Sequence, residues 1–171
     1  MKKNRRIVAT AVLSLLCFTA TAQLATNTSQ YKTAIGLRGG GTSGITIKHF
    51  VSSQAALDGI VSLWGNGIGL TLLYERHQTA FNVDGLQWYC GAGGHVALNF
   101  DRNYRYKNDN FYYHNREGNI GVGVDGIVGI EYKINPLPIA ISLDFKPFLE
   151  LNSNGSVFIA ADSGLGIKLT F

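Results

Sequence analysis

Cysteine, proline and charged residues are all scarce in this 171-residue chain. There are 2 cysteines, 3 prolines and 15% charged residues, whereas a typical soluble domain has about 25% charged residues. The length suits one domain with a sizeable core. Cys17 lies in a segment that we expect to be cleaved off, which leaves Cys90 as the remaining thiol. An intramolecular disulfide is therefore excluded, and the mature chain must be stabilised by other means.

The formal charge of +4 does not indicate a nucleic-acid-binding protein, because it is confined to the start of the chain. Four of the 15 Lys and Arg residues are Lys2, Lys3, Arg5 and Arg6, and the remaining 11 equal the 11 Asp and Glu residues. The rest of the chain therefore has no net basic surface to offer a phosphate backbone, and we predict no nucleic-acid partner.

The first 22 residues have the pattern of a cleaved export signal. A cationic start is followed by an apolar stretch from Ile7 to Phe18 and by the small residues Ala20-Thr21-Ala22. We predict a signal peptide over residues 1–22 and a polar leader over residues 23–30. The apolar stretch is shorter than the about 20 residues that a membrane helix needs, which argues against a membrane anchor.

Alternation of apolar and polar residues with a period of two fills residues 31–171 and predicts β-strands. Eight segments alternate in this way, and each is long enough for a membrane strand of about 9–11 residues. Turn-forming residues separate them, and only residues 101–118 form a long connection. The segments are Tyr31–Gly39, Thr42–Val51, Ala55–Trp64, Gly67–His77, Leu86–Phe100, Asn119–Ile134, Pro138–Leu149 and Ser156–Phe171.

The polar faces of these segments combine many glycines with balanced charge. A water-facing strand surface has no reason to favour glycine, whereas a narrow enclosed lumen does. Enclosed charges must also be paired. We therefore predict that these faces line the inside of a barrel, where six cations meet six anions. They are Lys32, Arg38, Lys48, Lys133, Lys146 and Lys168, and Asp58, Glu75, Asp125, Glu131, Asp144 and Asp162.

The apolar faces are expected to point outward, toward acyl chains, and to be free of Asp, Glu, Lys and Arg. Lysine or arginine at the midplane of a membrane barrel costs about 2–4 kcal/mol, so such a surface is a strong constraint. Aromatic residues are expected to form two interfacial girdles. One girdle contains Tyr31, Tyr74, Trp88, Tyr132 and Phe171, and the other contains Phe100 and Phe145.

These patterns predict an all-β fold, an eight-stranded antiparallel up-and-down transmembrane β-barrel over residues 31–171. A barrel of eight strands has an interior that side chains just fill, so no open pore is expected. Both termini are placed in the periplasm, and the connection 101–118 is placed outside the cell.

The last residues, Gly166, Leu169 and Phe171, resemble the C-terminal insertion signal of bacterial outer-membrane proteins. The barrel region resembles small eight-stranded outer-membrane proteins of the OmpX/OmpA-transmembrane type. Residues 81–89 and 124–132 also resemble segments of short outer-membrane barrels of Bacteroidota. The resemblance implies the outer membrane of a Gram-negative bacterium, contact with its lipid and lipopolysaccharide, and delivery by periplasmic chaperones and the barrel-insertion machinery. It does not imply an activity.

Residues with catalytic or ligand-binding chemistry are few. Residues 121–126 match the dinucleotide-binding pattern GxGxxG, but the alternation continues through them to Ile134, where a helix should begin. We interpret these glycines as spacers in the lumen. Cys90 is predicted to face lipid without a neighbouring base. We predict no cofactor, no metal site and no catalytic site, since the histidines also lack metal-ligand spacing. They are His49, His77, His95 and His114.

Two alternative functions stay open. A lipid A-modifying hydrolase needs a serine, a histidine and an acidic residue close together near the outer leaflet. The candidates for it are Ser62, Ser163, His95, Asp109 and His114. A soluble exported lipocalin-like barrel instead needs the apolar faces to point inward around a ligand.

The connection 101–118 is the candidate recognition surface, because tyrosine and arginine dominate binding hot spots and loops on rigid scaffolds often carry binding sites. Its residues could also extend two strands as a protruding ribbon, whose exposed edge would accept an added strand. We predict a structural or surface-interaction protein with an extracellular protein or glycan as partner. The binding residues are predicted to be Arg102, Tyr104, Arg105, Tyr106, Phe111, Tyr112 and Tyr113.

Overall fold

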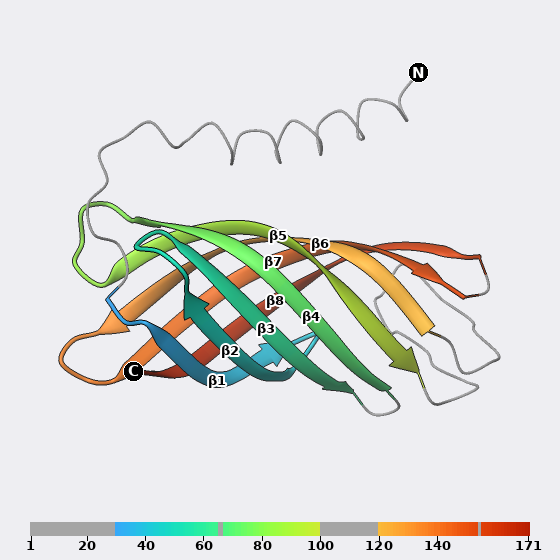
Figure 1. The fold of residues 1–171 in the computed structure, drawn as a ribbon, viewed down its shortest axis with the longest axis horizontal. Helices are drawn as coiled ribbons and strands as arrows, with labels where there is room; N and C mark the ends of the chain where they lie inside the picture. Colours follow the sequence, from blue (N-terminus) through green and yellow to red (C-terminus); the bar gives the residue numbers. More distant parts are fainter. Residues whose placement is uncertain (1–29, 65–66, 100–119, 154) are drawn as a thin grey trace, which may run out of the picture.

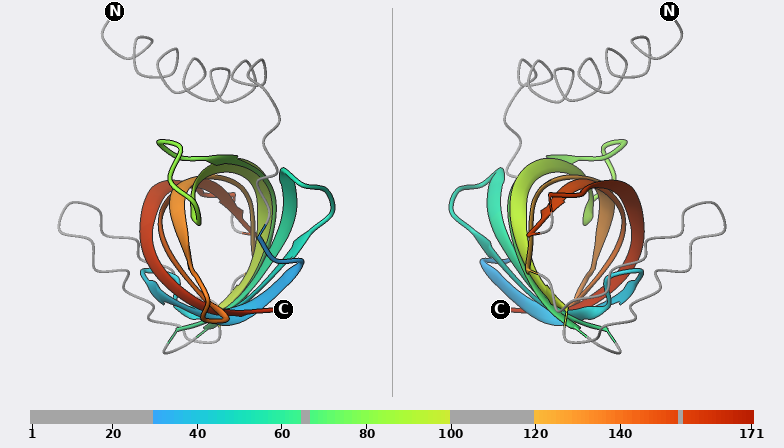
Figure 2. Two further views of the ribbon diagram at one scale, coloured as in Figure 1. Left: turned by 90° about the vertical axis from the view of Figure 1, so that its left-hand side faces the viewer. Right: turned by 90° about the vertical axis from the view of Figure 1, so that its right-hand side faces the viewer.

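The computed structural model describes residues 30–64, 67–99, 120–153 and 155–171. They form one closed barrel of eight antiparallel strands in which β8 pairs with β1 (Figures 1 and 2). The predicted all-β up-and-down barrel is confirmed. The strands are β1 (Thr33–Gly40), β2 (Gly44–Phe50), β3 (Ala55–Trp64), β4 (Gly67–Thr79), β5 (Leu86–Asn99), β6 (Ile120–Ile134), β7 (Ile139–Asn152) and β8 (Val157–Thr170). The predicted signal peptide, the leader up to residue 29 and the connection 101–118 lie outside the described residues.

The pairing register is staggered around the barrel. Ala34 in β1 pairs with Lys48 in β2, and the chain of paired residues continues from strand to strand as far as Ala160 in β8. Ala34 itself pairs with Thr170, ten residues further along β8. A stagger of this kind makes the strands tilt relative to the barrel axis. Inward side chains from strands far apart in the sequence consequently meet at one level.

Side chains alternate between the two faces of the barrel wall as predicted. Outward apolar residues are exposed, for example Leu72 by 58% and Leu165 by 61%. The opposite face carries buried charge, and Lys48 and Glu75 both have 0% exposure. Eleven of the twelve charged residues that we predicted for the inside are buried. The exception is Lys32, which is exposed.

The first residues of the sheet depart from the alternation. The main-chain amides of Lys32 and Thr33 both donate to the main-chain oxygen of Phe171, at 2.9 and 3.1 Å. Two residues therefore oppose one, as in a β-bulge, and the alternation shifts by one position. Tyr31 is buried and donates its hydroxyl hydrogen bond to Glu131. The predictions of an inward Lys32 and an outward Tyr31 were both wrong for this reason.

Arg76 is a second departure from prediction. β4 places Tyr74 on the outer face, and Arg76 follows two residues later as an exposed residue on the same face. The expectation of an outer face without charge is wrong at this position. Arg76 pairs with Ala55 and Cys90, close to the end of the barrel at which the C-terminus lies (Figure 1).

Apolar side chains also occupy part of the interior, which the assignment of polar residues to the inner face did not predict. One cluster lies at the end of the barrel that contains the C-terminus, and it consists of Tyr31, Ala34, Phe50, Ala56 and Ala140. A second cluster lies further inside and consists of Ile60, Leu73, Tyr89 and Ile127. Burial of these groups adds hydrophobic stabilisation to an interior that is otherwise held by charge.

Glycines give space to large inward side chains, as the spacer interpretation predicts. A Cβ atom on Gly164 would collide with the guanidinium of Arg38. A Cβ atom on Gly129 would lie 2.5 Å from the ring carbon Cζ of Tyr89. Both contacts are shorter than real Cβ atoms tolerate, so a large side chain on one strand requires glycine on its neighbour.

Candidate functional site in the polar interior

Lys48 is the centre of a charged cluster in the half of the interior nearer the C-terminus. Its ammonium lies 2.7 Å from Glu75, 3.3 Å from Glu131 and 3.7 Å from Asp58. Lys168 lies 3.4 Å from Glu131 and 3.9 Å from Asp58. We call these five residues the Lys48 cluster. Two cations are shared among three carboxylates, so each buried charge has an opposite charge close to it, which offsets part of the cost of removing it from water.

Aromatic rings and neutral polar groups enclose this cluster. Nε2 of His77 lies 3.1 Å from Glu75, and its Nδ1 lies 3.0 Å from the side-chain oxygen of Gln87. The His77 ring stacks on Tyr89 with 5.0 Å between centroids, and the Lys48 ammonium lies 4.3 Å from the centre of the Tyr89 ring. Among the described residues, Oε1 of Glu75 is the one buried side-chain oxygen or nitrogen without a hydrogen-bond partner. The cluster is otherwise saturated.

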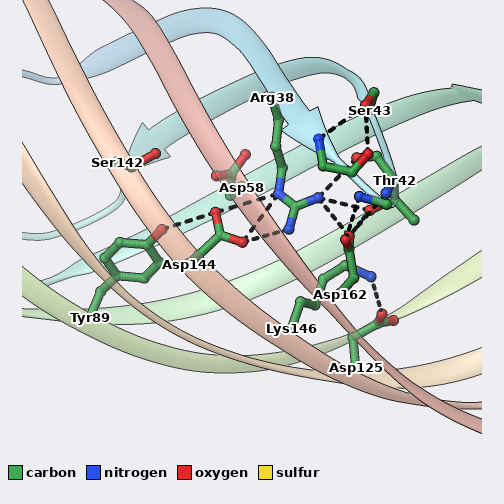
Figure 3. A network of polar contacts seen from close by, with 12 residues as sticks. Arg38, Thr42, Ser43, Asp58, Tyr89, Asp125, Ser142, Asp144, Lys146 and Asp162 are labelled. Atoms are coloured by element: carbon green, nitrogen blue, oxygen red, sulfur yellow. Dashed lines mark hydrogen bonds and ion pairs between the residues drawn. The ribbon is translucent and has the colours of Figure 1, made fainter. Parts of the chain in front are cut away.

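Arg38 joins β7 and β8 to the turn between β1 and β2 (Figure 3). Its guanidinium lies 2.5 Å from Asp144 and 2.8 Å from Asp162, and it also donates to the main-chain oxygen of Thr42 at 2.9 Å. Asp162 accepts hydrogen bonds from the main-chain amides of Gly41 and Thr42, at 2.7 and 3.1 Å. We call these residues the Arg38 cluster. Asp162 therefore holds the turn as well as the cation.

His95 holds a third group of charges. Its Nδ1 lies 2.7 Å from Asp125 and its Nε2 lies 3.1 Å from Glu150, while Lys146 lies 2.8 Å from Asp125. A neutral imidazole donates from one nitrogen, so both contacts are satisfied together only by the doubly protonated ring. Such a ring has no lone pair with which to accept a proton from a nucleophile. In this geometry His95 is an ion-pair partner of two carboxylates.

The structure does not assemble the candidate hydrolase residues. Ser163 is exposed on the outer face, whereas Ser62 is buried inside the barrel wall. Both ring nitrogens of His95 are occupied by carboxylates. The remaining candidates, Asp109 and His114, lie outside the described residues. Among the candidates at described positions, neither Ser62 nor Ser163 therefore reaches a ring nitrogen of His95.

The other sequence patterns that could indicate a ligand site lie in ordinary structural positions. Residues 121–126 lie within the continuous strand β6, so the GxGxxG match does not open a helix. Within the described ranges, no group of three or more His, Cys, Asp or Glu side chains is arranged to hold a metal ion. The part of the chain that the structure describes also contains no helix long and apolar enough to cross a membrane. Cys90 is half-buried on the outer face, between the exposed residues Trp88 and Ala92.

A lipocalin-like barrel requires an apolar lining around its ligand, whereas among the described residues the interior is lined mainly by polar and charged side chains. Its lining is dominated by paired charges from the Lys48 and Arg38 clusters, and the apolar faces of the strands point outward. Tyr89 is fully buried between these clusters, with its hydroxyl 3.5 Å from Asp144. Side chains therefore cross the lumen at several levels.

The residues predicted for surface recognition all lie between β5 and β6, outside the described residues. They are Arg102, Tyr104, Arg105, Tyr106, Phe111, Tyr112 and Tyr113. The structure shows where this connection is attached, because β5 ends at Asn99 and β6 begins at Ile120, at the end of the barrel opposite the C-terminus (Figure 1). Of the predicted insertion signal, Leu169 and Phe171 are exposed and Gly166 faces inward.

No protein-family model matches the chain, and no curated protein matches it. The structure shows an eight-stranded closed antiparallel barrel. The functional argument rests on that fold and on the chemistry of its two faces.

Proposed function

We propose that this protein is an integral outer-membrane β-barrel with a filled polar lumen, acting as a structural or surface-interaction protein through the connection 101–118. The observation that carries the proposal is the inverted polarity of the barrel wall: charges are buried inside, and apolar side chains are exposed around the outside. So large an exposed apolar surface is unfavourable in water and favourable among acyl chains.

Aromatic residues at one end of the outer face support this proposal. Tyr74, Trp88, Tyr132 and Phe171 are all exposed, and they lie in β4, β5 and β6 and directly after β8, toward the end that contains the C-terminus. Tyrosine and tryptophan favour membrane–water interfaces because one part of the ring is apolar and another part is polar. The four side chains are suited to one interfacial girdle.

The filled lumen supports a passive role. Lys48 in β2 reaches Glu131 in β6 across the barrel, and Arg38 in β1 and Tyr89 in β5 both reach Asp144 in β7. A solute would have to break buried ion pairs to pass, which costs several kcal/mol for each uncompensated charge. Presentation of a surface feature on a rigid cylinder is a better use of such a barrel than diffusion through it.

The proposed orientation places both termini in the periplasm. The turns after β2, β4 and β6 lie at the same end as the C-terminus, and the connection between β5 and β6 lies at the other end (Figure 1). In this orientation Leu169 and Phe171 face the insertion machinery, and residues 101–118 face an extracellular protein or glycan. Outer-membrane lipid and lipopolysaccharide surround the wall.

Membrane insertion is tested with the mature chain and two variants at one outward position. Leu72→Lys places a charge on the middle of the apolar face and is expected to make folding into bilayers less favourable by about 2–4 kcal/mol. Leu72→Met keeps the position apolar and should cost less than about 1.5 kcal/mol. Cell fractionation and the mobility of unheated samples in SDS gels report the folded membrane form. A soluble periplasmic chain without a heat-dependent mobility shift would contradict the proposal.

Orientation is tested by labelling single cysteines in intact cells, in a Cys90→Ser background. A membrane-impermeant maleimide is expected to label Asn110→Cys in the connection and to leave Ser53→Cys in the opposite turn unlabelled until the cells are opened. The reverse pattern would show that the connection 101–118 faces the periplasm, and surface recognition would then be excluded.

A further inference from the structure

Exposed charged side chains gather at one end of the barrel. Within the described ranges, the exposed Lys, Arg, Asp and Glu residues are Lys32, Arg76 and Asp84. All three lie at the end that contains the C-terminus, because Lys32 precedes β1, Arg76 is near the end of β4 and Asp84 is in the turn after it. The outer wall at the opposite end has no described counterpart.

Asp84, the anion of this set, already has hydrogen-bond partners, whereas Lys32 and Arg76 have no described carboxylate side chain beside them. Asp84 accepts hydrogen bonds from the side-chain amides of Gln30 and Asn135, at 2.6 and 3.3 Å. No carboxylate side chain of the described residues lies within ion-pair distance of Lys32 or Arg76. The two cations therefore lie on the outer surface without an ion-pair partner among the described carboxylate side chains.

His49 lies between the two cations on the same surface. The main-chain oxygen of Lys32 accepts from the amide of Phe50 at 2.9 Å, which puts Lys32 beside His49. His49 pairs with Leu57 in β3, Leu57 pairs with Tyr74 in β4, and Arg76 follows Tyr74 on the outer face. We call Lys32, His49 and Arg76 the basic rim. Neighbouring strands are about 4.8 Å apart, so the rim covers about 14 Å, within reach of long side chains.

An apolar strip continues directly from the basic rim along β2, β3 and β4. Ile47, Leu57 and Leu72 are exposed on it, and the aromatic ring of Tyr74 stands between the strip and Arg76. A ligand that fits both parts has a negatively charged head and long apolar tails. A zwitterionic head fits less well, because its ammonium would meet cations and the one exposed described carboxylate side chain is occupied elsewhere.

We infer that the basic rim and the adjoining apolar strip bind an anionic glycerophospholipid, with its phosphate between Lys32 and Arg76 and its acyl chains along Ile47, Leu57 and Leu72. The inference rests on the proposed membrane location, because a bilayer must surround the wall. In the proposed orientation the lipid belongs to the periplasmic leaflet. Long basic side chains at such a position keep their charge at the headgroup level while their stems cover the wall.

The expected loss of lipid binding in the variants follows from the attraction between basic residues and anionic lipid. Each Lys or Arg near an anionic surface strengthens binding by about fivefold. Removal of both charges should therefore weaken retention of the lipid by about 25-fold. Removal of one charge should weaken it by about fivefold. A variant with Lys32→Arg and Arg76→Lys keeps both charges and should retain most of the lipid binding.

The test inserts the mature chain into phosphatidylcholine vesicles with or without phosphatidylglycerol, extracts it in mild detergent and counts the retained lipids by native mass spectrometry. The neutral variant is Lys32→Gln with Arg76→Gln, and the matched control is Lys32→Arg with Arg76→Lys. Wild type and control are expected to retain phosphatidylglycerol in preference to phosphatidylcholine, and the neutral variant is expected to lose that preference. The two single Gln variants should fall between them.

Two failures are distinguishable in this experiment. Mobility of unheated samples in SDS gels reports insertion into pure phosphatidylcholine vesicles, which does not depend on the basic rim. Normal insertion with equal retention of both lipids, or with full retention by the neutral variant, would overturn the lipid site alone. A chain that enters neither kind of vesicle would overturn both the lipid site and the proposed membrane location.

Discussion

Charge is buried in different ways at the two ends of the barrel interior. In the Lys48 cluster, two cations are shared among three carboxylates, and Lys48 and Glu75 have 0% exposure under the apolar cap of Tyr31 and Phe50. At the other end, the side chains of His95 and Glu150 keep 8% and 15% exposure. At the same end, the Arg38 cluster forms hydrogen bonds with the turn between β1 and β2.

This difference separates two uses of buried charge. A shared and fully sealed network cannot lose one member without leaving several opposite charges uncompensated, so it should determine the stability of the whole barrel. The Arg38 cluster, whose Asp162 also holds main-chain amides, should determine the local order of a turn, and the partly open pair of His95 and Glu150 should have a smaller, local effect. Substitutions at the two ends therefore have effects of different size and extent.

The largest expected effect is that of Lys48→Met, which leaves three buried carboxylates with Lys168 as their remaining lysine. We expect the free energy of unfolding to fall by about 3–5 kcal/mol, because unpaired buried charge is costly. Urea unfolding of the folded barrel in detergent micelles measures it. Lys48→Arg keeps the charge and should lose much less. A loss below about 1 kcal/mol for Lys48→Met would show that the cluster is not the stability centre.

Asp162→Ala should have the next largest effect, at the opposite end. The variant loses the ion pair with Arg38 and the hydrogen bonds to the amides of Gly41 and Thr42, and should cost about 1.5–3 kcal/mol. Limited proteolysis should cut the turn at residues 41–43 before the strands unfold. The neighbouring Ser163→Ala, on the exposed outer face, is the control and should leave the cleavage rate unchanged.

Gly129→Ala should cost about 1–2 kcal/mol, because the new methyl group meets the Tyr89 ring beside the Lys48 cluster. Gly126→Ala in the same strand is the matched control, since its Cβ would have an ordinary contact at 3.5 Å with Pro147. Thermal unfolding in detergent, followed by circular dichroism, compares the two. Equal melting temperatures would show that the space opposite Tyr89 is not limiting.

The smallest effect is expected for His95→Gln, at about 0.5–1.5 kcal/mol. The amide can replace one hydrogen bond but not both carboxylate contacts, and the site is already partly open to solvent. Hydrogen exchange should show faster opening of β5 and β7 near residues 95 and 150, with unchanged protection around Lys48. Loss of protection throughout the barrel would contradict the proposed separation of the two ends.

Much of the fold could be predicted from the sequence because the alternation is regular. The eight predicted segments differ from the observed strands by at most three residues at either end. The inward set was predictable for the same reason, since side chains in a strand reach opposite faces in turn. Glu150 was left out because the predicted seventh segment ended one residue before it, although it continues the inward series of Asp144 and Lys146.

Other features depend on tertiary structure and could not be predicted. The bulge at Lys32 and Thr33 depends on the position of Phe171, which directly follows β8 and is 138 residues away from Thr33 in the sequence. The partners of each buried charge depend on the stagger, as with Arg38 and Asp144, which are 106 residues apart. Arg76 was predictable by counting from Tyr74, and the general expectation of an uncharged outer face concealed it.

The pairing of β1 with β8 joins the first strand of the sheet to the last. Until that seam closes, both strands present unpaired main-chain groups, which are templates for association with other chains. Closure also brings together residues from nearly opposite ends of the sequence, and contacts of such long range make folding slow. The growing sheet therefore needs protection for most of its assembly, and the final hydrogen bonds remove the last edge at which it could aggregate.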